Sequence, residues 1–518
     1  MEPARPDSTS PASGERYDLL VIGGGINGVG VARDAAGRGL KVLLCEQADL
    51  GAATSSASSK LLHGGLRYLE QFQFRMVRHA LAEREVLLAA APHIVTPLRF
   101  VLPHNRKIRP YWMIRVGIWL YDHLARRNTL PGSTGLDLRQ DIAGQPLRER
   151  FRRGFEYSDC WVDDARLVVL TAIDARQRGA TILTRTRCVA ATRVDGGWQV
   201  ELEDTISGER RCVMASVIVN AAGPWAEGVA RQILGVESRY RSRLVKGSHI
   251  VVPRMVDHGK AYILQNDDKR IVFVLPFEDD FTMIGTTDVP YDGDPFAAEI
   301  DAEETDYLLA VVNDHFRRQL SADNIVWSFS GVRPLYDDGS RSAAKVSRDY
   351  ILETHAAPGI DGPAALTIWG GKLTGFRLLA EDVLEQLRPR FPGMPGRWTA
   401  GALLPGGNLH PPGIEQFTTM LTQVYDWLPP KLARAYARRY GNLAHTVLGN
   451  ASSLQRHGEE LAPGLYTREV DYLVRHEWAR TADDILWRRT KLGLHATPTD
   501  VQRVEDYITQ LPQATGKA

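Results

Sequence analysis

Three glycines near the start of the chain have the spacing of a diphosphate-binding turn. They are Gly23, Gly25 and Gly28 of "VIGGGINGVG", and they follow the apolar run "YDLLVI". Gly23 allows a tight turn, Gly25 lets the backbone approach a pyrophosphate, and Gly28 lets a helix pack against the preceding strand. The N-terminus of that helix presents free N–H groups and the positive end of its dipole to an anion. The pattern predicts a dinucleotide site.

An acidic residue and three later stretches indicate which dinucleotide binds. Glu46 ends the strand "KVLLCE", where its carboxylate can accept hydrogen bonds from ribose hydroxyls. NAD and FAD both fit this unit. FAD is favoured by the hydroxyl-rich loop "ATSSASSKLLHGGLRYLE" (53–70), by "SVIVNAAGPWAEGVA" (216–230) and by "ALTIWGGKLTGFRLLAEDVLEQL" (365–387). The helix of the last stretch can face the flavin pyrimidine and stabilise negative charge on the reduced ring.

We expect the FAD contacts to come from the glycine turn, the end of the second strand and these three stretches. No zinc signature or other metal-ligand spacing is present, so no metal is expected. The expected cofactor residues are Gly23, Gly24, Gly25, Ile26, Asn27, Gly28, Glu46, Thr54, Ser55, Ser58, Ser59, Lys60, Leu61, His63, Gly64, Ala222, Gly223, Trp225, Gly371, Lys372, Leu373 and Thr374.

Net charge, cysteine spacing and the length of apolar runs exclude several classes of protein. The formal net charge of +1 predicts no general attraction to nucleic acid. The four cysteines, which lie far apart without a CxxC pair, indicate reduced thiols in the cytosol. No apolar run reaches the roughly 18 residues that a membrane-spanning helix needs. Residues 1–16, rich in Pro and Ser, predict a disordered tail and not a signal peptide.

The order of the patterns predicts an α/β fold with a discontinuous, Rossmann-like FAD domain. We assign residues 17–80, 155–230 and 330–390 to that domain. Residues 81–154 and 231–329 are assigned to a β-rich substrate or cap domain. A Pro/Gly-rich linker follows, and the polar-helical pattern of residues 400–518 predicts an all-helical C-terminal domain.

Long strings of the sequence resemble FAD-dependent glycerol-3-phosphate dehydrogenases of the bacterial aerobic, respiratory type. The match includes "GGGINGVGVARDAAGRGLKVLLCE", "GFEYSDCWVDDARLV", "VKGSHIVVPR", "IGTTDVPYDGDP", "SGVRPL", "GGKLTGFRLLAE" and the C-terminal "WRRTKLG". The resemblance implies oxidation of sn-glycerol 3-phosphate to dihydroxyacetone phosphate, with FAD as hydride acceptor and a membrane ubiquinone or menaquinone receiving the electrons. It also implies a homodimer attached peripherally to the cytoplasmic, inner face of the cell membrane. Around the substrate it implies Arg67, Tyr68, His249, Arg333, Arg348, Lys372 and Thr374.

Residue chemistry agrees with a phosphorylated alcohol as substrate. Arginine binds phosphate in bidentate geometry, and Arg67, Arg333 and Arg348, with Lys372, stand at loop ends near the motifs. We expect His249, Arg333 and Lys372 to be catalytic. A neutral His249 with a near-neutral pKa could accept the alcohol proton, or it could only orient the substrate. Lys372 could stabilise the anionic reduced flavin or contact the substrate.

Two further questions stay open at this level. The segment "KIRPYWMIRVGIWLYDHLARR" (107–127) has the pattern of an interfacial membrane segment and equally that of a buried helix. A glycerophosphate oxidase that passes electrons to O2 is a close alternative, although no long insertion of the oxidase kind stands between residues 300 and 390. An amine- or amino-acid-oxidising flavoenzyme, or a flavin-binding sensor without turnover, fits the density of basic residues less well.

Overall fold

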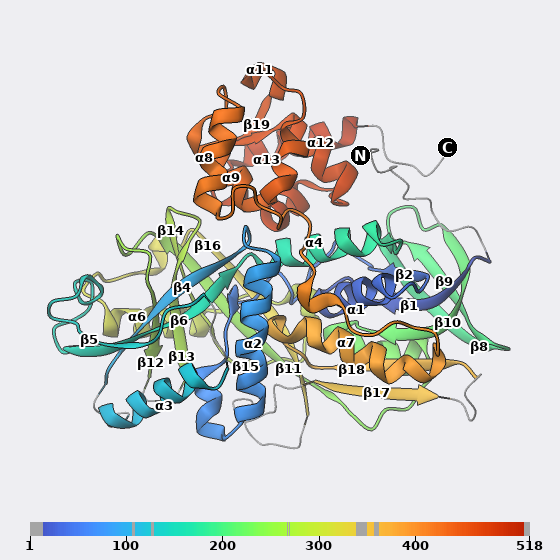
Figure 1. Cartoon of the computed structure of the whole chain (residues 1–518), viewed down its shortest axis with the longest axis horizontal. Coiled ribbons are helices and arrows are strands. Elements are labelled where there is room, and N and C mark those ends of the chain that lie inside the picture. Colours follow the sequence, from blue (N-terminus) through green and yellow to red (C-terminus); the bar gives the residue numbers. More distant parts are fainter. Residues whose placement is uncertain are drawn as a thin grey trace.

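The computed structural model describes residues 14–105, 109–125, 129–266, 268, 270–337, 350–356 and 362–511. Two large β-sheets lie side by side, and a helical body rests on one end of both (Figure 1). Most of the expected N-terminal tail, residues 1–13, lies outside the described residues, and Arg16 at its end already belongs to the first strand.

The first sheet has eight strands in the order β17-β18-β10-β1-β2-β7, with β9 and β8 added antiparallel beside β10. The pairs β1–β10, β1–β2, β10–β18 and β2–β7 are parallel. Helix α1 packs against α4 and α7 and forms the cover of this sheet. The bounds are β1 (Arg16–Ile22), α1 (Ile26–Gly37), β2 (Val42–Cys45), α4 (Asp164–Gln177), β7 (Thr181–Leu183), β8 (Thr186–Val194), β9 (Gly197–Asp204), β10 (Arg210–Asn220), β17 (Ile351–Ala356), β18 (Ala364–Trp369) and α7 (Phe376–Leu387).

The second sheet has ten strands in the order β15-β11-β14-β13-β12-β4-β6-β3, with β16 beside β11 and β5 beside β6. Its side chains alternate between two cores, as the two-residue period of a strand requires. Val101 of β4 packs in the core that includes Leu308 of α6, and Phe100 packs in the core that includes Ile118 of α3. The bounds are β3 (Leu61–Leu62), α2 (Phe74–Ala90), β4 (Val95–Pro103), α3 (Tyr111–His123), β5 (Thr134–Asp137), β6 (Arg153–Val162), β11 (Ser242–Pro253), β12 (Ala261–Gln265), β13 (Ile271–Phe277), β14 (Phe281–Gly285), β15 (Val289–Pro290), α6 (Ala302–His315) and β16 (Trp327–Tyr336).

Two of the expected domain boundaries fall inside strands of the second sheet. The boundaries at residues 155 and 330 fall inside β6 and β16, and both strands belong wholly to the second sheet. Strand β6 pairs antiparallel with β4 from Val95 to Pro103, and β16 pairs along the length of β11. The apolar pattern of a strand shows that it is buried but does not name its partner, so these boundaries could not be read correctly.

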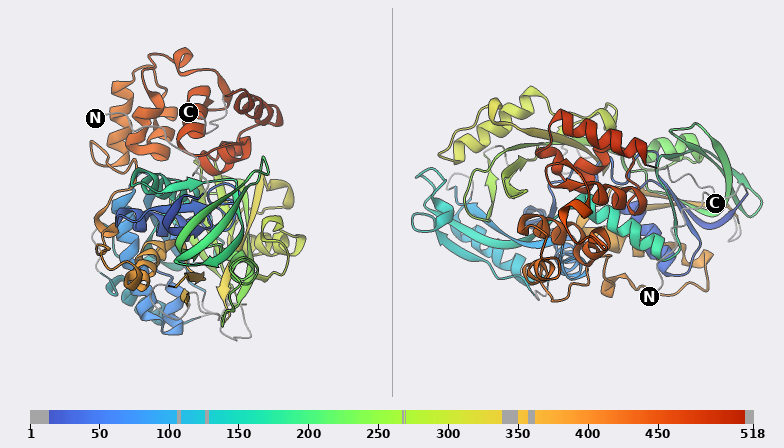
Figure 2. Two further views of the ribbon diagram at one scale, coloured as in Figure 1. Left: turned by 90° about the vertical axis from the view of Figure 1, so that its right-hand side faces the viewer. Right: turned by 90° about the horizontal axis from the view of Figure 1, so that it is seen from above.

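The helical body has its own apolar core and contains one short β-hairpin that the sequence pattern did not indicate. In Figure 2 it lies above the two sheets in the left view and over the middle of the molecule in the right view. Together with the parallel centre of the first sheet it confirms the predicted α/β class with a helical C-terminal domain. The bounds are α8 (Ile414–Val424), α9 (Pro430–Tyr440), α10 (Ala444–Leu448), α11 (Leu454–His457), β19 (Glu460–Ala462), β20 (Leu465–Tyr466), α12 (Thr467–His476), the π-helical turn η11 (Asp484–Arg489) and α13 (Pro498–Gln510).

Short helical turns complete the parts of the fold that the site uses. They are η1 (Leu66–Gln71), η3 (Gly223–Trp225), α5 (Ala226–Gly228), the π-turn η4 (Val229–Ile233), η5 (Pro295–Ala297) and η7 (Leu373–Gly375). Within the described ranges, no helix combines the length and the apolar character needed to cross a bilayer.

Candidate functional site

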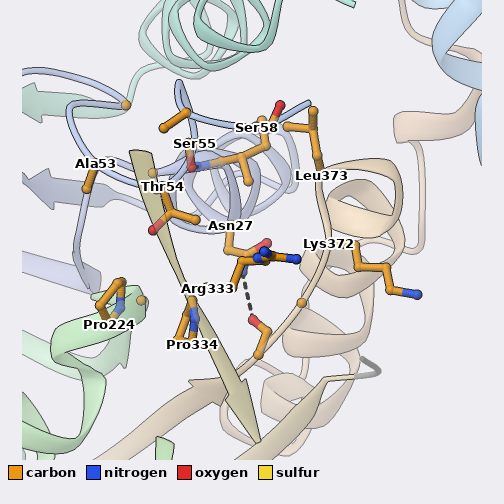
Figure 3. A pocket seen from close by; sticks show the side chains of 18 of the residues that line it. Asn27, Ala53, Thr54, Ser55, Ser58, Pro224, Arg333, Pro334, Lys372 and Leu373 are labelled. Atoms are coloured by element: carbon orange, nitrogen blue, oxygen red, sulfur yellow. Dashed lines mark hydrogen bonds between the residues drawn. The ribbon is translucent and has the colours of Figure 1, made fainter. Parts of the chain in front are cut away.

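A cavity of about 560 Å³ lies between the two sheets, and both contribute to its wall. Its size falls within the roughly 300–1,000 Å³ typical of small-molecule sites. The β1–α1 turn, the loop before β3, the turn η7 and strand β16 contribute wall residues that Figure 3 labels. Strand β11 of the second sheet contributes Gly247 and His249. Stretches that are hundreds of residues apart in the sequence therefore meet at one site.

The glycine turn at one end of the cavity has the geometry that a diphosphate requires. Gly23 has a φ of +112°, and a Cβ atom placed on Gly28 would lie 1.9 Å from the Gly23 carbonyl oxygen. Gly25, the N-cap of helix α1, supplies no side-chain cap, so the helix N-terminus faces the cavity, and the first of its N–H groups, that of Ile26, is bonded to Ser55 Oγ of the neighbouring loop. An open helix N-terminus attracts anions through its free N–H groups and its dipole.

Glu46 holds this turn from the end of β2. Its carboxylate accepts hydrogen bonds from Gly24 N at 2.6 Å and from Ala48 N at 2.8 Å, and its side chain lines the cavity. Burial raises the pKa of Glu46, and the two backbone N–H donors oppose that rise by stabilising the carboxylate. Because a carboxylate has about four acceptor positions, ribose hydroxyls can still bind the same group.

The hydroxyl-rich loop is held by several different elements. Ser55 Oγ accepts from Ile26 N at 3.0 Å, Thr54 Oγ1 donates to the Val332 carbonyl at 2.6 Å, and Ser58 Oγ donates to Asp164 at 2.7 Å. These bonds tie the loop to α1, β16 and α4. The loop is therefore a rigid wall of the cavity.

Lys60 differs from its expected role as a cofactor residue. Its side chain is fully buried outside the cavity wall, where Nζ lies 2.7 Å from Asp164 Oδ1 and 3.0 Å from the Ser56 carbonyl. Burial lowers the pKa of the amine, and the negative charge of Asp164 opposes that fall. Lys60 and Asp164 form a buried ion pair behind the loop.

The other expected cofactor residues fall into two sets. Gly24 is bonded to Glu46, Gly28 packs against Gly23, and Gly64 N donates to Tyr121 Oη at 2.8 Å, so these three lie behind the wall. The cavity wall itself contains Gly23, Gly25, Ile26, Asn27, Glu46, Thr54, Ser55, Ser58, Ser59, Leu61, His63, Ala222, Gly223, Trp225, Gly371, Lys372, Leu373 and Thr374.

His249 and Arg333 line the other end of the cavity, and neighbouring glycines make room for both. A Cβ on Gly285 would lie 2.2 Å from Cδ2 of His249, and a Cβ on Gly247 would lie 2.2 Å from Nη2 of Arg333. Gly285 pairs directly opposite His249 in the β11–β14 ladder. The absence of these side chains creates the space in which an imidazole and a guanidinium approach one ligand.

His249 is a buried, neutral imidazole. Its Nε2 lies 2.9 Å from Ser59 Oγ, and its ring stacks on Phe329 with centroids 4.8 Å apart. Burial, followed by the positive charges of Lys60 and Arg333, lowers the pKa of His249 to about 3. The expected near-neutral pKa is therefore wrong, since the sequence could not show that the ring is buried beside two cations. Nδ1 is buried and has no hydrogen-bond partner among the described residues.

Arg333 is held by residues that the sequence analysis did not single out. Its Nη1 lies 2.9 Å from Asp288 Oδ1, and its Nη2 donates to the Thr287 carbonyl at 2.7 Å. Asp288 and Thr286 also line the cavity. The polar triplet of "IGTTDVP", which follows the apolar strand "FTMI", is the sequence signal that could have assigned these residues to the site.

Lys372 and Tyr68 form a separate contact on the cavity wall. Lys372 Nζ lies 4.1 Å from the Tyr68 ring centroid and 3.0 Å from Met76 Sδ. In Figure 3 the Lys372 side chain points away from Asn27 and Arg333. Thr374 is buried in η7. The side chain of Arg67 and all of Arg348 lie outside the described residues.

Several wall residues were missed altogether. Thr186, Arg187 and Cys188 at the start of β8 lie along the wall, together with Phe273 and Phe296. A change from polar to apolar residues in "TRTRCV" carries no chemical signal for a ligand, so spacing alone could not assign these residues.

The wall fits a ligand with a diphosphate and further hydrogen-bonding groups. Asn27 donates from Nδ2 to the Gly370 carbonyl at 3.3 Å, the dashed bond in Figure 3, while its buried Oδ1 has no partner among the described residues. A buried unpaired acceptor is costly unless a ligand satisfies it. The open helix N-terminus, Asn27 and Glu46 together match what FAD requires.

Comparisons with known proteins agree with this geometry. A family model described as FAD dependent oxidoreductase matches residues 18–377, and one described as the C-terminal domain of alpha-glycerophosphate oxidase matches residues 398–515. Glycerol-3-phosphate dehydrogenase of Pseudomonas aeruginosa is 55% identical over 95% of each chain. Aerobic glycerol-3-phosphate dehydrogenase of Escherichia coli is 51% identical, over 96% of this chain and 98% of the relative. D-erythritol 1-phosphate dehydrogenase of Brucella abortus is 50% identical, over 94% and 97%.

Solved structures show the same fold. Glycerol-3-phosphate dehydrogenase of Bacillus halodurans, complexed with FAD, aligns with a TM-score of 0.76 at 27% identity, over 96% of this chain and 90% of that one. L-alpha-glycerophosphate oxidase of Mycoplasma pneumoniae, with FAD bound, has a TM-score of 0.59 at 18% identity, over 76% of this chain and 99% of that one, and supports the fold alone. The chain is an FAD-dependent oxidoreductase and belongs to the FAD-dependent glycerol-3-phosphate dehydrogenase family.

Proposed function

We propose that this enzyme oxidises sn-glycerol 3-phosphate to dihydroxyacetone phosphate and passes the electrons to a membrane quinone. When bound, FAD supplies the hydride acceptor for the hydrogen on C2 of the substrate. The relatives named glycerol-3-phosphate dehydrogenase support the substrate, and the paired positions of His249 and Arg333 in the cavity support the chemistry. The main support for the proposal is that His249 and Arg333 line the same cavity.

Arg333 is the proposed phosphate ligand. The contacts to Asp288 and Thr287 hold the guanidinium of Arg333 in place on the cavity wall, and the planar, bidentate geometry of this group suits a phosphate. Because Asp288 partly neutralises the positive charge of Arg333, this charge is compensated before substrate binds. A dianionic phosphate restores negative charge at this end of the cavity when substrate enters.

His249 is proposed to orient the C2 hydroxyl and to receive its proton. The buried, unpartnered Nδ1 is the available acceptor when Nε2 donates to Ser59 Oγ. A ring with a pKa of about 3 is neutral and ready to accept at physiological pH, but it is a weak base before substrate binds. Since the charge of Arg333 is one cause of the low pKa, a phosphate dianion on Arg333 makes His249 more basic when it is needed.

The direct test is anaerobic reduction of the bound flavin. We expect the visible flavin band of the purified holoenzyme to bleach when sn-glycerol 3-phosphate is added and to return when a soluble quinone is added. Glycerol without phosphate is the matched control, because it has the reacting hydroxyl but no group for Arg333. A yellow holoenzyme that stays yellow with sn-glycerol 3-phosphate would refute the proposed substrate.

A four-carbon polyol phosphate is the second candidate substrate. The Brucella abortus relative at 50% identity is named D-erythritol 1-phosphate dehydrogenase, so overall similarity at this level does not separate the two substrates. Both would place a phosphate on Arg333 and a secondary hydroxyl beside His249. The ratio of kcat/KM for the two compounds in the same assay decides between them.

The electron acceptor is a quinone or O2, and the products separate these outcomes. With a quinone as acceptor, reoxidation of the reduced enzyme is fast with soluble quinone and yields little hydrogen peroxide in air. A glycerophosphate oxidase would release peroxide in proportion to the substrate consumed. Peroxide yield under air therefore tests the dehydrogenase assignment against its closest alternative.

Helix α3 supports peripheral attachment to a membrane. Trp112, Val116 and Trp119 lie on one face of α3 and are 65%, 57% and 58% exposed, whereas Ile114 and Ile118 of the opposite face are buried. The helix lies at the end of the molecule opposite the helical body (Figure 1). An exposed face with two tryptophans suits the headgroup region of a bilayer.

Vesicle binding tests this surface. In co-sedimentation with phosphatidylglycerol-containing vesicles, we expect the double variant Trp112→Ser and Trp119→Ser to bind about tenfold more weakly. Val424→Ser removes a comparably exposed apolar side chain from the helical body and serves as the control. Equal binding of all three proteins would reject α3 as the lipid contact. The inner face of the cell membrane and a homodimer remain our proposals on the basis of the resemblance.

A further inference from the structure

None of the residues of the C-terminal motif "WRRTKLG" lines the cavity, but several of their side chains contact residues outside the helical body. Residues 487–491 begin inside η11 and continue past its end. The ends of β14 and β16 lie beneath the helical body (Figure 1). Arginine, lysine and tryptophan of this segment each contact a different part of the site's surroundings. The motif therefore joins the C-terminal domain to the rest of the enzyme.

Three ion pairs anchor the segment. Arg489 Nη1 lies 2.6 Å and Arg488 Nε 2.7 Å from Asp49 Oδ2, and the Arg489 and Asp49 side chains are almost fully buried. Asp49 belongs to the turn in which Gly51 N donates to the Gly24 carbonyl at 3.1 Å. Lys491 Nζ lies 3.3 Å from Asp163. Buried, hydrogen-bonded arginine pairs of this kind fix position strongly.

A continuous series of ring contacts, stacked at both ends and tilted in the middle, then runs from this segment to His249. The Trp487 and Trp327 centroids are 4.3 Å apart, Trp327 and Phe329 are 4.8 Å apart, and Phe329 and His249 are 4.8 Å apart. Every second position of β16 faces the same side of the strand, and this side carries Trp327, Phe329, Gly331 and Arg333. Movement of Trp327 would be transmitted along β16, which carries Arg333, and through Phe329 to His249 on the paired strand β11.

We propose that Trp487 is a positioning residue that holds the β16 wall, and with it His249 and Arg333, in the geometry required for hydride removal from the substrate. The proposal rests on the proposed function of that site. Its physical basis is that packed rings leave no space for the wall to relax independently, and a displacement of about 1 Å at a reacting group can cost about a hundredfold in rate. The helical domain then contributes to the reaction from outside the cavity.

The experiment compares two tryptophans of the same domain in the holoenzyme. Trp487→Ala removes the ring from the series of ring contacts, Trp487→Phe keeps a stacking partner, and Trp427→Ala removes a similarly half-buried ring that packs inside the helical body. The rate of anaerobic flavin reduction at saturating sn-glycerol 3-phosphate and the apparent substrate Kd are measured by stopped flow.

We expect Trp487→Ala to lower the reduction rate about tenfold and Trp487→Phe to restore most of it. Trp427→Ala should leave the rate near that of the unaltered enzyme even where it lowers Tm. A normal reduction rate in Trp487→Ala would overturn the proposal. Equal rate losses in both alanine variants would also overturn it, because a general loss of domain stability would then be the cause.

A second variant covers the case in which Trp487→Ala does not fold. A Cβ on Gly493 would lie 2.4 Å from the Trp487 ring, so Gly493→Ala displaces that ring without removing it and should produce the same slower reduction.

Visible circular dichroism of bound FAD reports on its surroundings without turnover. If the unaltered holoenzyme is not reduced by sn-glycerol 3-phosphate, the proposed function fails. A changed dichroism in the Trp487 variants alone would still support positioning, and an unchanged one would reject it.

Discussion

The two ends of the cavity are built in different ways. At the expected cofactor end, the groups that fit a dinucleotide come from one short unit: the backbone turn at Gly23, the start of α1 and the carboxylate of Glu46 all lie at the first strand–helix–strand unit. At the substrate end, side chains from strands of distant sequence converge, and their chemistry depends on burial and on one another. The first end is specified by local spacing and the second by tertiary packing.

This difference predicts opposite sensitivities. A backbone site tolerates changes of charge nearby but fails when an atom blocks the turn. A side-chain site tolerates small changes of shape but fails when a charge or a hydrogen-bonding group is lost. Substitutions at each end, and at the ion pair behind the loop between them, can separate the two kinds of failure.

The largest effect is expected for Gly28→Ala. The added Cβ would lie 1.9 Å from the Gly23 carbonyl oxygen, so the β1–α1 turn cannot keep its shape. We expect the variant to be purified without FAD or not to fold, as measured by flavin absorbance per protein. Gly117→Ala is the matched control, because Gly117 also lies within a helix and its Cβ meets nothing within 4 Å. Normal flavin content in Gly28→Ala would contradict the turn geometry.

The next largest effect is expected for Lys60→Met. Removing the amine leaves Asp164 buried without its ion-pair partner, which costs about 3–5 kcal/mol in the free energy of unfolding. The double variant Lys60→Met with Asp164→Asn should recover part of that loss in urea unfolding of the holoenzyme. A Lys60→Met protein of normal stability that binds FAD far more weakly would restore Lys60 to the direct contact role first expected of it.

These cases show how much of the site could be predicted from the sequence. The glycine turn and Glu46 follow a spacing in which each residue's role is local, and the structure brings them together at the cavity. Lys60 belongs to the same hydroxyl-rich stretch, but its φ of +55° turns the side chain toward Asp164, more than a hundred residues later. The low pKa of His249 requires Phe329, Ser59 and Arg333 around it, and only the folded sheet supplies them.

A smaller effect, confined to catalysis, is expected for Arg333→Met. Loss of the phosphate ligand should lower kcat/KM for sn-glycerol 3-phosphate by about a hundredfold or more, while FAD content stays normal. Arg254→Met, at an exposed arginine outside the cavity, should change neither quantity. Loss of FAD from Arg333→Met would break the division between the two ends of the cavity. An unchanged kcat/KM would remove Arg333 from the substrate site.

The smallest effect is expected from pH acting through His249. Because burial and two cations lower its pKa to about 3, the free enzyme keeps this ring neutral throughout pH 5.5–8, and its titration should change kcat/KM less than about twofold there. The substrate phosphate itself titrates near pH 6, so the profile of His249→Gln is recorded alongside. A break that occurs in both profiles belongs to the phosphate. A break near pH 6.5 that disappears in His249→Gln would contradict the buried, neutral ring.

The same shift predicts how stability depends on pH. The folded pKa of His249 lies below its ordinary value of 6.5, so the unfolded chain binds the proton first as pH falls. The contribution of the neutral ring to the free energy of unfolding is fully present above pH 6.5 and is lost progressively between pH 6.5 and 3. The loss amounts to about 2 kcal/mol at pH 5. Comparing urea unfolding of the enzyme and of His249→Gln at pH 7.5 and 5 isolates this part. A pH dependence that is identical in both proteins would mean that His249 is already accessible to protons in the folded state, and the substrate end would then be less closed than its packing indicates.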